Sequence, residues 1–281
     1  MNSGEKTIPS AALVGDGMSR TAYKRIVVKA GTGVLTGGSD RLHLPTMANL
    51  VEQIAAIQLA GAEVLLVSSG AIAAGRRPLG ERGDLPNVPF RQVLAAVGQN
   101  HLMNTYSSLF DWWDITIAQV LLSRHDLSDS QHSTNVHNTL RSLMERRVVP
   151  IINENDVVAV EEIGEIFGDN DVLSALVARL VEADLLILLT DTEGLMTKDP
   201  RLDPTAVRVP RVDRIDHDIE ALVGDGVKPW SRGGMRTKVE AAKLATGAGV
   251  TVVVCDGQRP GVVSLVYRGE DVGTLFAPVS A

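Results

Sequence analysis

The sequence has little cysteine, few aromatic residues and no long apolar run, and each scarcity excludes a class of protein. Its single cysteine, Cys255, rules out an internal disulfide framework and a cysteine-based metal site, and indicates a reducing compartment, the cytoplasm. No apolar stretch reaches the roughly 18 residues of a membrane span, so we expect no membrane segment. With aromatic residues at only 4%, an aromatic-rich β-sandwich is disfavoured.

Excess positive charge is also lacking. The formal net charge is −7, so no basic stripe is available to neutralise a row of nucleic-acid phosphates, and we expect no nucleic-acid partner. What the chain does have is 281 residues, 44% of them apolar, which is enough to bury a large core in one or two domains. These properties favour an enzyme that holds any phosphate locally.

The chain divides into a leader and one folded region. Residues 1–24 mix glycine, serine, proline and both charge signs, which predicts a flexible leader rather than a signal peptide. Residues 25–281 alternate short apolar runs, typical of strands covered on both faces, with stretches of helical period. This pattern predicts an α/β fold, a three-layer αβα sandwich with a mostly parallel central sheet. The expected strands contain 26–28, 64–67, 148–152, 185–189 and 251–254.

Polar and glycine-rich residues follow the first four expected strands. In an open parallel sheet the carboxyl ends of the strands form the ligand crevice, so these residues are expected to meet there. A weak boundary at 181–185 divides a substrate-side half, about 25–183, from a nucleotide-side half, about 184–281. Residues 199–232, with four prolines, are expected to form a loop-rich excursion from the sheet, a candidate lid or wall of the nucleotide-side half.

Two basic elements are suited to phosphate. Lys29 ends a strand and is followed by a Gly-Thr-Gly turn, where the backbone can approach a phosphate closely; the alternative is a solvated edge lysine. The second, Gly233-Gly234-Met235-Arg236-Thr237-Lys238, leads into a helix whose free N–H groups can seat phosphate oxygens, or it is simply a helix cap. Neither has the Gly-x-x-x-x-Gly-Lys-Ser/Thr order of a P-loop.

The acidic run 168–171 precedes another expected helix. Each of its polar residues suits an N-cap, but Asp169, Asn170 and Asp171 together exceed what a cap needs. In phosphoryl transfer, two lysines near the moving group need a carboxylate to organise them. Asp171 is the candidate for that role.

Seven strings in order give the chain a family resemblance, covering about residues 25–276. It resembles the glutamate 5-kinases of the amino acid kinase family, without their small C-terminal PUA module. The strings are Val28-Lys29-x-Gly31-Thr32, Ser69-Gly70-Ala71-Ile72, Ile152-Asn153-Glu154-Asn155-Asp156, Phe167-Gly168-Asp169-Asn170-Asp171-x-Leu173-Ser174-Ala175, Leu189-Thr190-Asp191-x-x-Gly194-Leu195, Asp199-Pro200-Arg201 and Gly233-Gly234-Met235-x-Thr237-Lys238.

The resemblance implies a reaction and a site. The reaction is ATP-dependent phosphorylation of the γ-carboxylate of L-glutamate, the first step of proline biosynthesis. Lys29 and Lys238 would contact the transferring phosphoryl group, with Asp171 orienting both. The implied substrate-binding residues are Ser69, Asp156, Asn170 and Asp169. The implied ATP-binding residues are Lys29, Gly31, Thr190, Asp191, Arg232, Gly233, Gly234, Met235, Arg236, Thr237 and Lys238.

The resemblance also implies the cofactors and partners. ATP would bring Mg²⁺, held mainly by its phosphates, so no protein metal site is expected. A homodimer or homotetramer and feedback inhibition by proline are implied as well. Physical reasoning adds that Asp156 and Asp169 suit the ammonium of a free amino acid, while Asn170 and Ser69 suit its carboxylates.

Two alternatives stay open. One is a kinase of the same fold with another acceptor, namely N-acetylglutamate, aspartate, carbamate or a nucleoside monophosphate. The other is a catalytically silent sensor of an amino acid or a nucleotide. The combination of Lys29, Asp171 and Lys238 disfavours the sensor, since a sensor has no transition state to stabilise.

Overall fold

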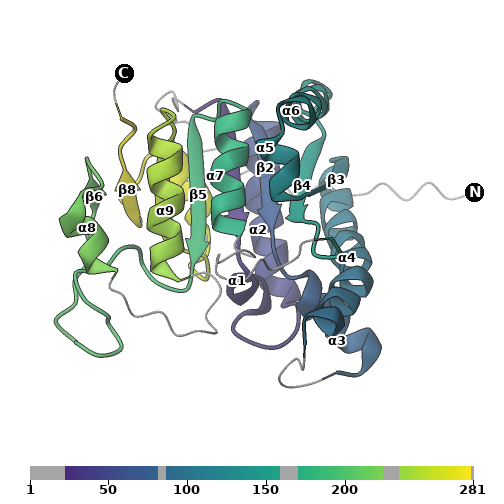
Figure 1. Cartoon of the computed structure of the whole chain (residues 1–281), viewed down its shortest axis with the longest axis horizontal. Coiled ribbons are helices and arrows are strands. Elements are labelled where there is room, and N and C mark those ends of the chain that lie inside the picture. The colour runs from purple at the N-terminus through teal and green to yellow at the C-terminus, as the bar shows by residue number, and fades with distance from the viewer. Residues whose placement is uncertain (1–22, 82–86, 159–169, 224–233, 280–281) are drawn as a thin grey trace, which may run out of the picture.

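The computed structural model describes residues 23–81, 87–158, 170–223 and 234–279 (Figure 1). Their centre is an eight-stranded sheet in the order β3-β4-β2-β1-β5-β7-β8-β6. All of its pairings are parallel except that between β7 and β8. The strands are β1 Arg25–Ala30, β2 Glu63–Ser68, β3 Ile117–Leu122, β4 Val149–Glu154, β5 Leu185–Thr190, β6 Arg211–Val212, β7 Thr251–Asp256 and β8 Thr274–Phe276.

Helices cover both faces of the sheet, as Figure 1 shows with α6, α7 and α9 in front and α2 behind. One apolar core joins the sheet to α1, α2, α3, α4 and α10, and the other joins it to α6, α7 and α9. The helices are α1 Thr32–Thr36, α2 Leu44–Leu59, α3 Ala71–Leu79, α4 Val88–Phe110, α5 Arg124–Ser128, α6 Ser130–Glu145, α7 Asn170–Leu180, α8 His217–Leu222, α9 Met235–Thr246 and α10 Val262–Tyr267, with a 3-10 turn at Asp111–Trp113.

Alternation along the strands decides which core each residue joins. On β1, Ile26 and Val28 face the α2 side and Val27 faces the α7 side, because successive side chains of a strand point to opposite faces. Both faces are covered, so β1 and β5 are buried along almost their whole length. The same alternation determines which face of the sheet the polar side chains at the strand ends point to.

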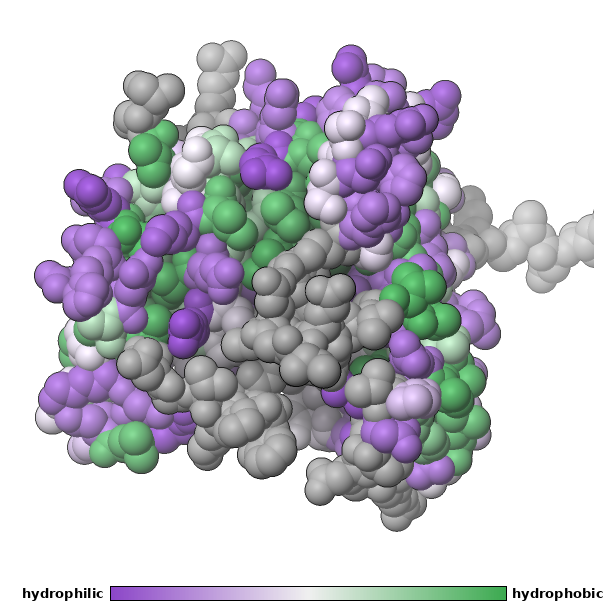
Figure 2. All heavy atoms as spheres, in the orientation of Figure 1, coloured by the Kyte–Doolittle hydropathy of each residue, from purple (hydrophilic) through white to green (hydrophobic). Residues whose placement is uncertain are grey.

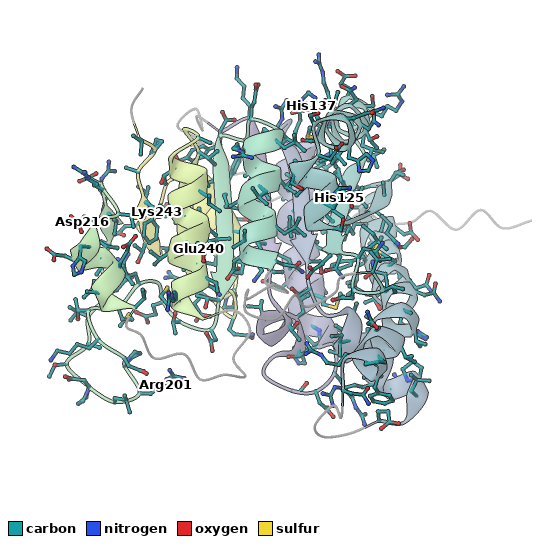
Figure 3. The ribbon with its side chains drawn as sticks, viewed as in Figure 1. His125, His137, Arg201, Asp216, Glu240 and Lys243 are labelled. Atoms are coloured by element: carbon teal, nitrogen blue, oxygen red, sulfur yellow. The ribbon has the colours of Figure 1, made fainter. Side chains whose placement is uncertain are left out.

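The αβα sandwich and its mostly parallel sheet confirm the fold predicted from the sequence, and all five expected strands are present. Strands β3, β6 and β8 were not predicted. The supposed loop-rich excursion at 199–232 is partly regular, since its described part contains β6 and α8. Lys243 of α9 holds α8 through an ion pair with Glu220 at 2.6 Å (Lys243 is labelled in Figure 3).

None of the helices within the described ranges combines the length and apolarity that crossing a membrane requires. Of the predicted leader, residues 1–22 lie outside the described residues. Lys24, at its end, is fixed, because the N–H groups of Lys24 and Arg25 donate to Asp184 Oδ2 over 2.6 and 2.8 Å.

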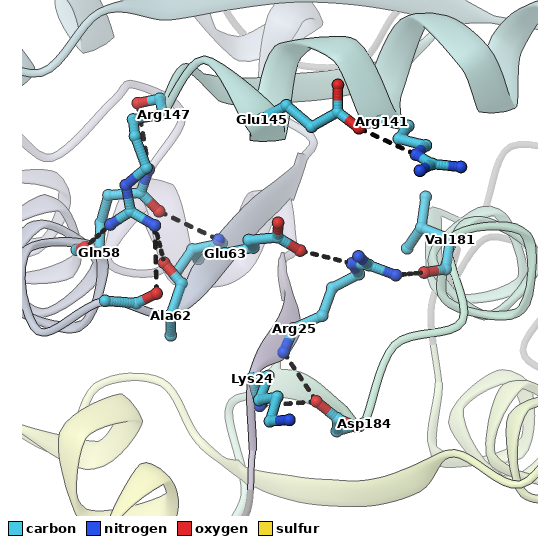
Figure 4. A network of polar contacts seen from close by, with 12 residues as sticks. Lys24, Arg25, Gln58, Ala62, Glu63, Arg141, Glu145, Arg147, Val181 and Asp184 are labelled. Carbon is cyan, nitrogen blue, oxygen red and sulfur yellow. Dashed lines mark hydrogen bonds and ion pairs between the residues drawn. The ribbon is translucent and has the colours of Figure 1, made fainter.

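The amino ends of the strands are joined by a separate polar network (Figure 4). Arg25 pairs with Glu63 at 2.7 Å, which links the starts of β1 and β2. Arg147, just before β4, donates to the carbonyls of Gly61 and Ala62 over 3.2 and 3.0 Å, and also to the carbonyl of Gln58. Of these residues, Gln58 belongs to the last turn of α2, and Gly61 and Ala62 form the turn that follows the helix. Arg147 therefore caps the Gln58 carbonyl of α2 and holds the turn after the helix, from 85 to 89 residues away in the chain.

We predict that Arg147→Ala lowers the free energy of unfolding by about 1.5 kcal/mol, the usual contribution of hydrogen bonds from a charged donor. The matched control is Arg146→Ala, because Arg146 donates only to Ser142 within its own helix. It should stay within about 0.5 kcal/mol of the unmodified protein. Urea denaturation measures both, and equal effects of the two substitutions would contradict the capping role.

Candidate active site

Two lysines and one aspartate form a buried cluster at the carboxyl end of the sheet. Lys29 Nζ lies 2.5 Å from Asp171 Oδ1, and Lys238 Nζ lies 2.9 Å from Asp171 Oδ2. The side chain of Asp171 is fully buried, and both lysine side chains are 4% exposed. The structure thus brings together all three residues predicted to be catalytic.

Each member of this cluster comes from a different element. Lys29 follows the alternation of β1 and shares the face of Val27, which is the face covered by α7 and α9. Asp171 stands in the first turn of α7, and Lys238 in the first turn of α9. The negative charge at the start of α7 suits the positive end of the helix dipole. The cluster closes because both helices begin above the end of β1.

Electrostatics keeps Asp171 ionised. Burial by itself would raise the pKa of Asp171, but the charges of Lys29 and Lys238 and their hydrogen bonds outweigh it and hold the pKa below its usual range. The hydroxyl of Thr237 also lies 3.0 Å from Asp171 Oδ2. The shared carboxylate holds both ammonium groups at the carboxyl ends of the strands, where phosphate oxygens could meet them.

The predicted phosphate-side residues gather around this cluster. Gly31 caps α1 beside Lys29, and a Cβ at this position would lie 3.2 Å from Lys29 Nζ. Thr190 ends β5, next to β1 in the sheet, and its hydroxyl lies 3.2 Å from Asp191 Oδ1. Gly234 begins α9 with no side-chain cap, so the first N–H groups of this helix suit phosphate oxygens. Met235 is partly buried against the core between the sheet and α6, α7 and α9, and Arg236 is exposed.

The predicted substrate-side residues lie at the ends of β2 and β4. Asn170 Nδ2 contacts Ser69 Oγ at 2.8 Å and the Ser68 carbonyl at 3.2 Å. Asp156, in the turn after β4, is partly buried, and this burial raises its pKa while the nearby charge of Arg91 opposes the shift. Ser69, Asn170 and Asp156 therefore border the same strand ends as the lysine cluster.

Helix α4 contributes residues that the sequence interpretation missed. Gln99 Oε1 accepts a hydrogen bond of 3.0 Å from Asn153 Nδ2, and the Tyr106 hydroxyl contacts Ser68 Oγ at 2.8 Å. With Arg91 they are spaced eight and seven residues apart, which places them on one face of the helix. That spacing was the available signal, but the sequence interpretation did not use it.

Three predicted site residues, Asp169, Arg232 and Gly233, lie outside the described residues. Within the described ranges, no group of three or more His, Cys, Asp or Glu side chains has an arrangement that could hold a metal ion. Figure 3 shows His125 and His137 on the outer helices α5 and α6, away from the carboxyl ends of the central strands. Both oxygens of Asp171 already face lysines, so Mg²⁺ would be held here by the phosphates of a nucleotide rather than by this carboxylate.

Solved structures with this fold are distant in sequence. The chain aligns with UMP kinase from Bacillus anthracis at a TM-score of 0.59 and 17% identity, covering 92% of this chain and 97% of that one. It aligns with isopentenyl phosphate kinase from T. acidophilum at a TM-score of 0.62 and 17% identity, covering 90% and 99%. These likenesses establish the fold alone.

The sequence comparisons are closer. The profile of the amino acid kinase family matches residues 24–256. A glutamate 5-kinase from Dehalococcoides mccartyi (strain CBDB1) is 49% identical over 262 residues, which are 93% of this chain and 70% of that protein. A glutamate 5-kinase from Herpetosiphon aurantiacus is also 49% identical, over 94% of this chain and 70% of that protein. The chain therefore belongs to the amino acid kinase family and, within it, to the glutamate 5-kinases.

Proposed function

We propose that this protein transfers the γ-phosphoryl group of ATP to the γ-carboxylate of L-glutamate, forming γ-glutamyl phosphate for the first step of proline biosynthesis. The observation that carries the proposal is the buried cluster of Lys29, Asp171 and Lys238. Identities near 49% to glutamate 5-kinases over more than 90% of the chain support glutamate as the acceptor. The cytoplasm is the proposed location.

The reaction needs little from the protein beyond position and charge. A γ-carboxylate oxygen forms the new bond to the γ-phosphorus, the bond from that phosphorus to the β,γ-bridging oxygen breaks, and ADP leaves with that electron pair. No proton has to move, since the attacking carboxylate is already ionised. Lys29 and Lys238 would neutralise charge on the phosphoryl oxygens, and Asp171 would keep the two ammonium groups at a fixed separation.

The nucleotide and the acceptor would enter from different sides of the lysine cluster. Strands β1 to β4 form one side of the sheet and β5 to β8 the other, with β1 and β5 adjacent. This order supports a division into a substrate-side half, about 25–183, and a nucleotide-side half, about 184–281. ATP would lie over Gly31, Thr190, Asp191 and the start of α9, bringing Mg²⁺ on its phosphates, and glutamate over Ser69, Asp156 and Asn170.

The test of this function is ADP release in the presence of ATP and Mg²⁺ with L-glutamate, N-acetylglutamate or aspartate as the acceptor. We expect turnover with L-glutamate and little with the other two. Turnover with another acceptor only would establish a different kinase of this fold, and no turnover with any acceptor would favour a sensor. Adding L-proline to the same assay tests the proposed feedback inhibition.

Lys238→Ala should lower kcat by at least about a hundredfold, because it removes one preorganised charge from the transition state. The matched control is Lys243→Ala on the same helix, where the ammonium group is 2.6 Å from Glu220 on the surface. That variant should keep its kcat. Melting temperatures of both variants separate lost catalysis from lost folding, and an unchanged kcat in Lys238→Ala would remove this residue from its proposed role.

We also propose that the protein is a homo-oligomer that associates through β3. Among the described residues this strand is at one edge of the sheet and pairs with β4 alone, and it contains no charged residue between Ile117 and Leu122. Edge strands of proteins that stay monomeric are usually protected by charge, proline or a covering element. Trp112, just before β3, is 78% exposed, and Figure 2 shows apolar side chains gathered on the side where α3 and α4 lie. These features support a second copy of the chain as the covering element.

Light scattering after size exclusion should give a dimer or tetramer for the unmodified 30.0 kDa chain. Gln119→Lys should shift it toward the monomer, because like charges from two copies would meet at the shared edge. Gln119 is exposed, so folding should be unaffected. Gln131→Lys on the surface of α6 is the control. A monomeric unmodified protein, or an oligomer unchanged by Gln119→Lys, would argue against this interface.

A further inference from the structure

A chain of three side-chain amides crosses the carboxyl end of the sheet. Gln99 reaches it from α4, on one face of the sheet, and Asn170 reaches it from α7, on the other face. Asn153, at the end of β4, links the two. Asn153 Nδ2 donates to Gln99 Oε1 over 3.0 Å, and Asn153 Oδ1 accepts from Asn170 Nδ2 over 2.9 Å.

The backbone fixes the orientation of these amides. The N–H of Glu154 donates to Asn153 Oδ1 over 2.9 Å. Because a backbone N–H can only donate, the atom that faces it must be the oxygen of the Asn153 amide. The carbonyl of Ser68 lies 3.2 Å from Asn170 Nδ2, and a carbonyl can only accept. Turning either asparagine by 180° would bring donor against donor or acceptor against acceptor. Gln99 must then present its oxygen to Asn153.

This orientation leaves two polar atoms at the ends of the amide chain. Asn170 Oδ1 and Gln99 Nε2 are both buried, and neither has a hydrogen-bond partner among the residues that the structure describes. A buried polar group without a partner costs about 1 to 3 kcal/mol, so such atoms are expected to meet a ligand or water. One of them is an acceptor and the other a donor.

We propose that these two atoms bind the head group of the amino-acid substrate. Gln99 Nε2 donates to its α-carboxylate, and Asn170 Oδ1 accepts from its α-ammonium. This assigns Gln99 a contact with the substrate. It also reverses the expectation that Asn170 meets a carboxylate, because the NH₂ group of Asn170 is already shared among three acceptors, on Ser68, Ser69 and Asn153. The inference rests on the proposed function, since it concerns the acceptor of that reaction.

The arrangement selects a zwitterion by its pattern of donors and acceptors. Asp156, in the turn after the same strand, offers a carboxylate that can pair with the ammonium. An N-acetylated acceptor has no ammonium to pair with that carboxylate, and a dicarboxylate without an amine leaves Asn170 Oδ1 unpaired. Leaving such a buried group unpaired is an effective way for a site to reject an analogue.

The test compares Gln99→Met and Gln99→Glu. Gln99→Met keeps the length of the side chain but removes the acceptor for Asn153 and the donor for the substrate. Gln99→Glu keeps the acceptor for Asn153 and turns the donor toward the substrate into a carboxylate oxygen. We expect both variants to raise the KM for L-glutamate at least about tenfold while kcat and the KM for ATP stay within about threefold, because the lysine cluster is untouched.

Asn100→Leu is the matched control, because Asn100 is the next residue of α4 and is exposed. It should leave both KM values unchanged. If Gln99→Glu behaves like the unmodified enzyme while Gln99→Met does not, Gln99 acts only through Asn153 and the proposed carboxylate contact is wrong. If neither variant raises the KM for glutamate, the proposed contact is also wrong.

The ammonium contact is tested with glutarate, which is glutamate without its amine, as a competitor of L-glutamate. The unmodified enzyme should bind glutarate at least about tenfold more weakly than glutamate, and equal binding would overturn the role of Asn170 Oδ1. These outcomes are distinguishable from failure of the proposed function. If the unmodified enzyme releases no ADP with glutamate, the function itself is wrong; if it does and only the variant results differ, the head-group contacts are wrong.

Discussion

The contact of one buried carboxylate with two buried ammonium groups is the constraint on which the site depends. A single ammonium or carboxylate at this depth would lose its hydration without compensation, at a cost of several kcal/mol. Asp171 contacts Lys29 and Lys238 together, so one carboxylate compensates both buried ammonium groups. Two ammonium groups held at one place are suited to the oxygens of a phosphoryl group. The same contact ties β1, α7 and α9 together at the carboxyl end of the sheet.

The parallel sheet determines where this contact can form. Parallel strands bring their carboxyl ends to the same end of the sheet, and the connecting helices begin above that end. The first turns of α7 and α9 therefore lie over the end of β1, with their unpaired N–H groups facing the crevice. At the amino ends of the strands, Arg25 and Glu63 join the starts of β1 and β2. Arg147 caps the last turn of α2 there. The candidate active site and these structural contacts are therefore at opposite ends of the strands.

The sequence was most informative where a local rule operates. Apolar runs located the strands of the sheet centre, such as β1 and β5, because burial on both faces leaves a continuous apolar signal. Lys29, Asp171 and Lys238 were predicted because each stands at a strand end or a helix start. Strand β3 was missed, since as a partly exposed edge strand it lacks that signal. The site residues of α4 were missed because the apolar residues of this helix lie all round it, so no amphipathic stripe shows which face meets the site.

The hydrogen bonds of Asn170 could not be predicted for a different reason. Its position in the first turn of α7 follows from sequence, but the direction of its amide follows from Glu154, Ser68 and Gln99, which lie 16, 102 and 71 positions away. Neutral amides can orient the head group of the acceptor without adding charge. The electrostatic potential at Asp171 is then set mainly by the two lysines. An ionised group in place of Asn153 would act on Asp171 as well as on the substrate. The amides would thus set the direction of the acceptor's head group, while the positive charge for the phosphoryl group comes from the lysine cluster.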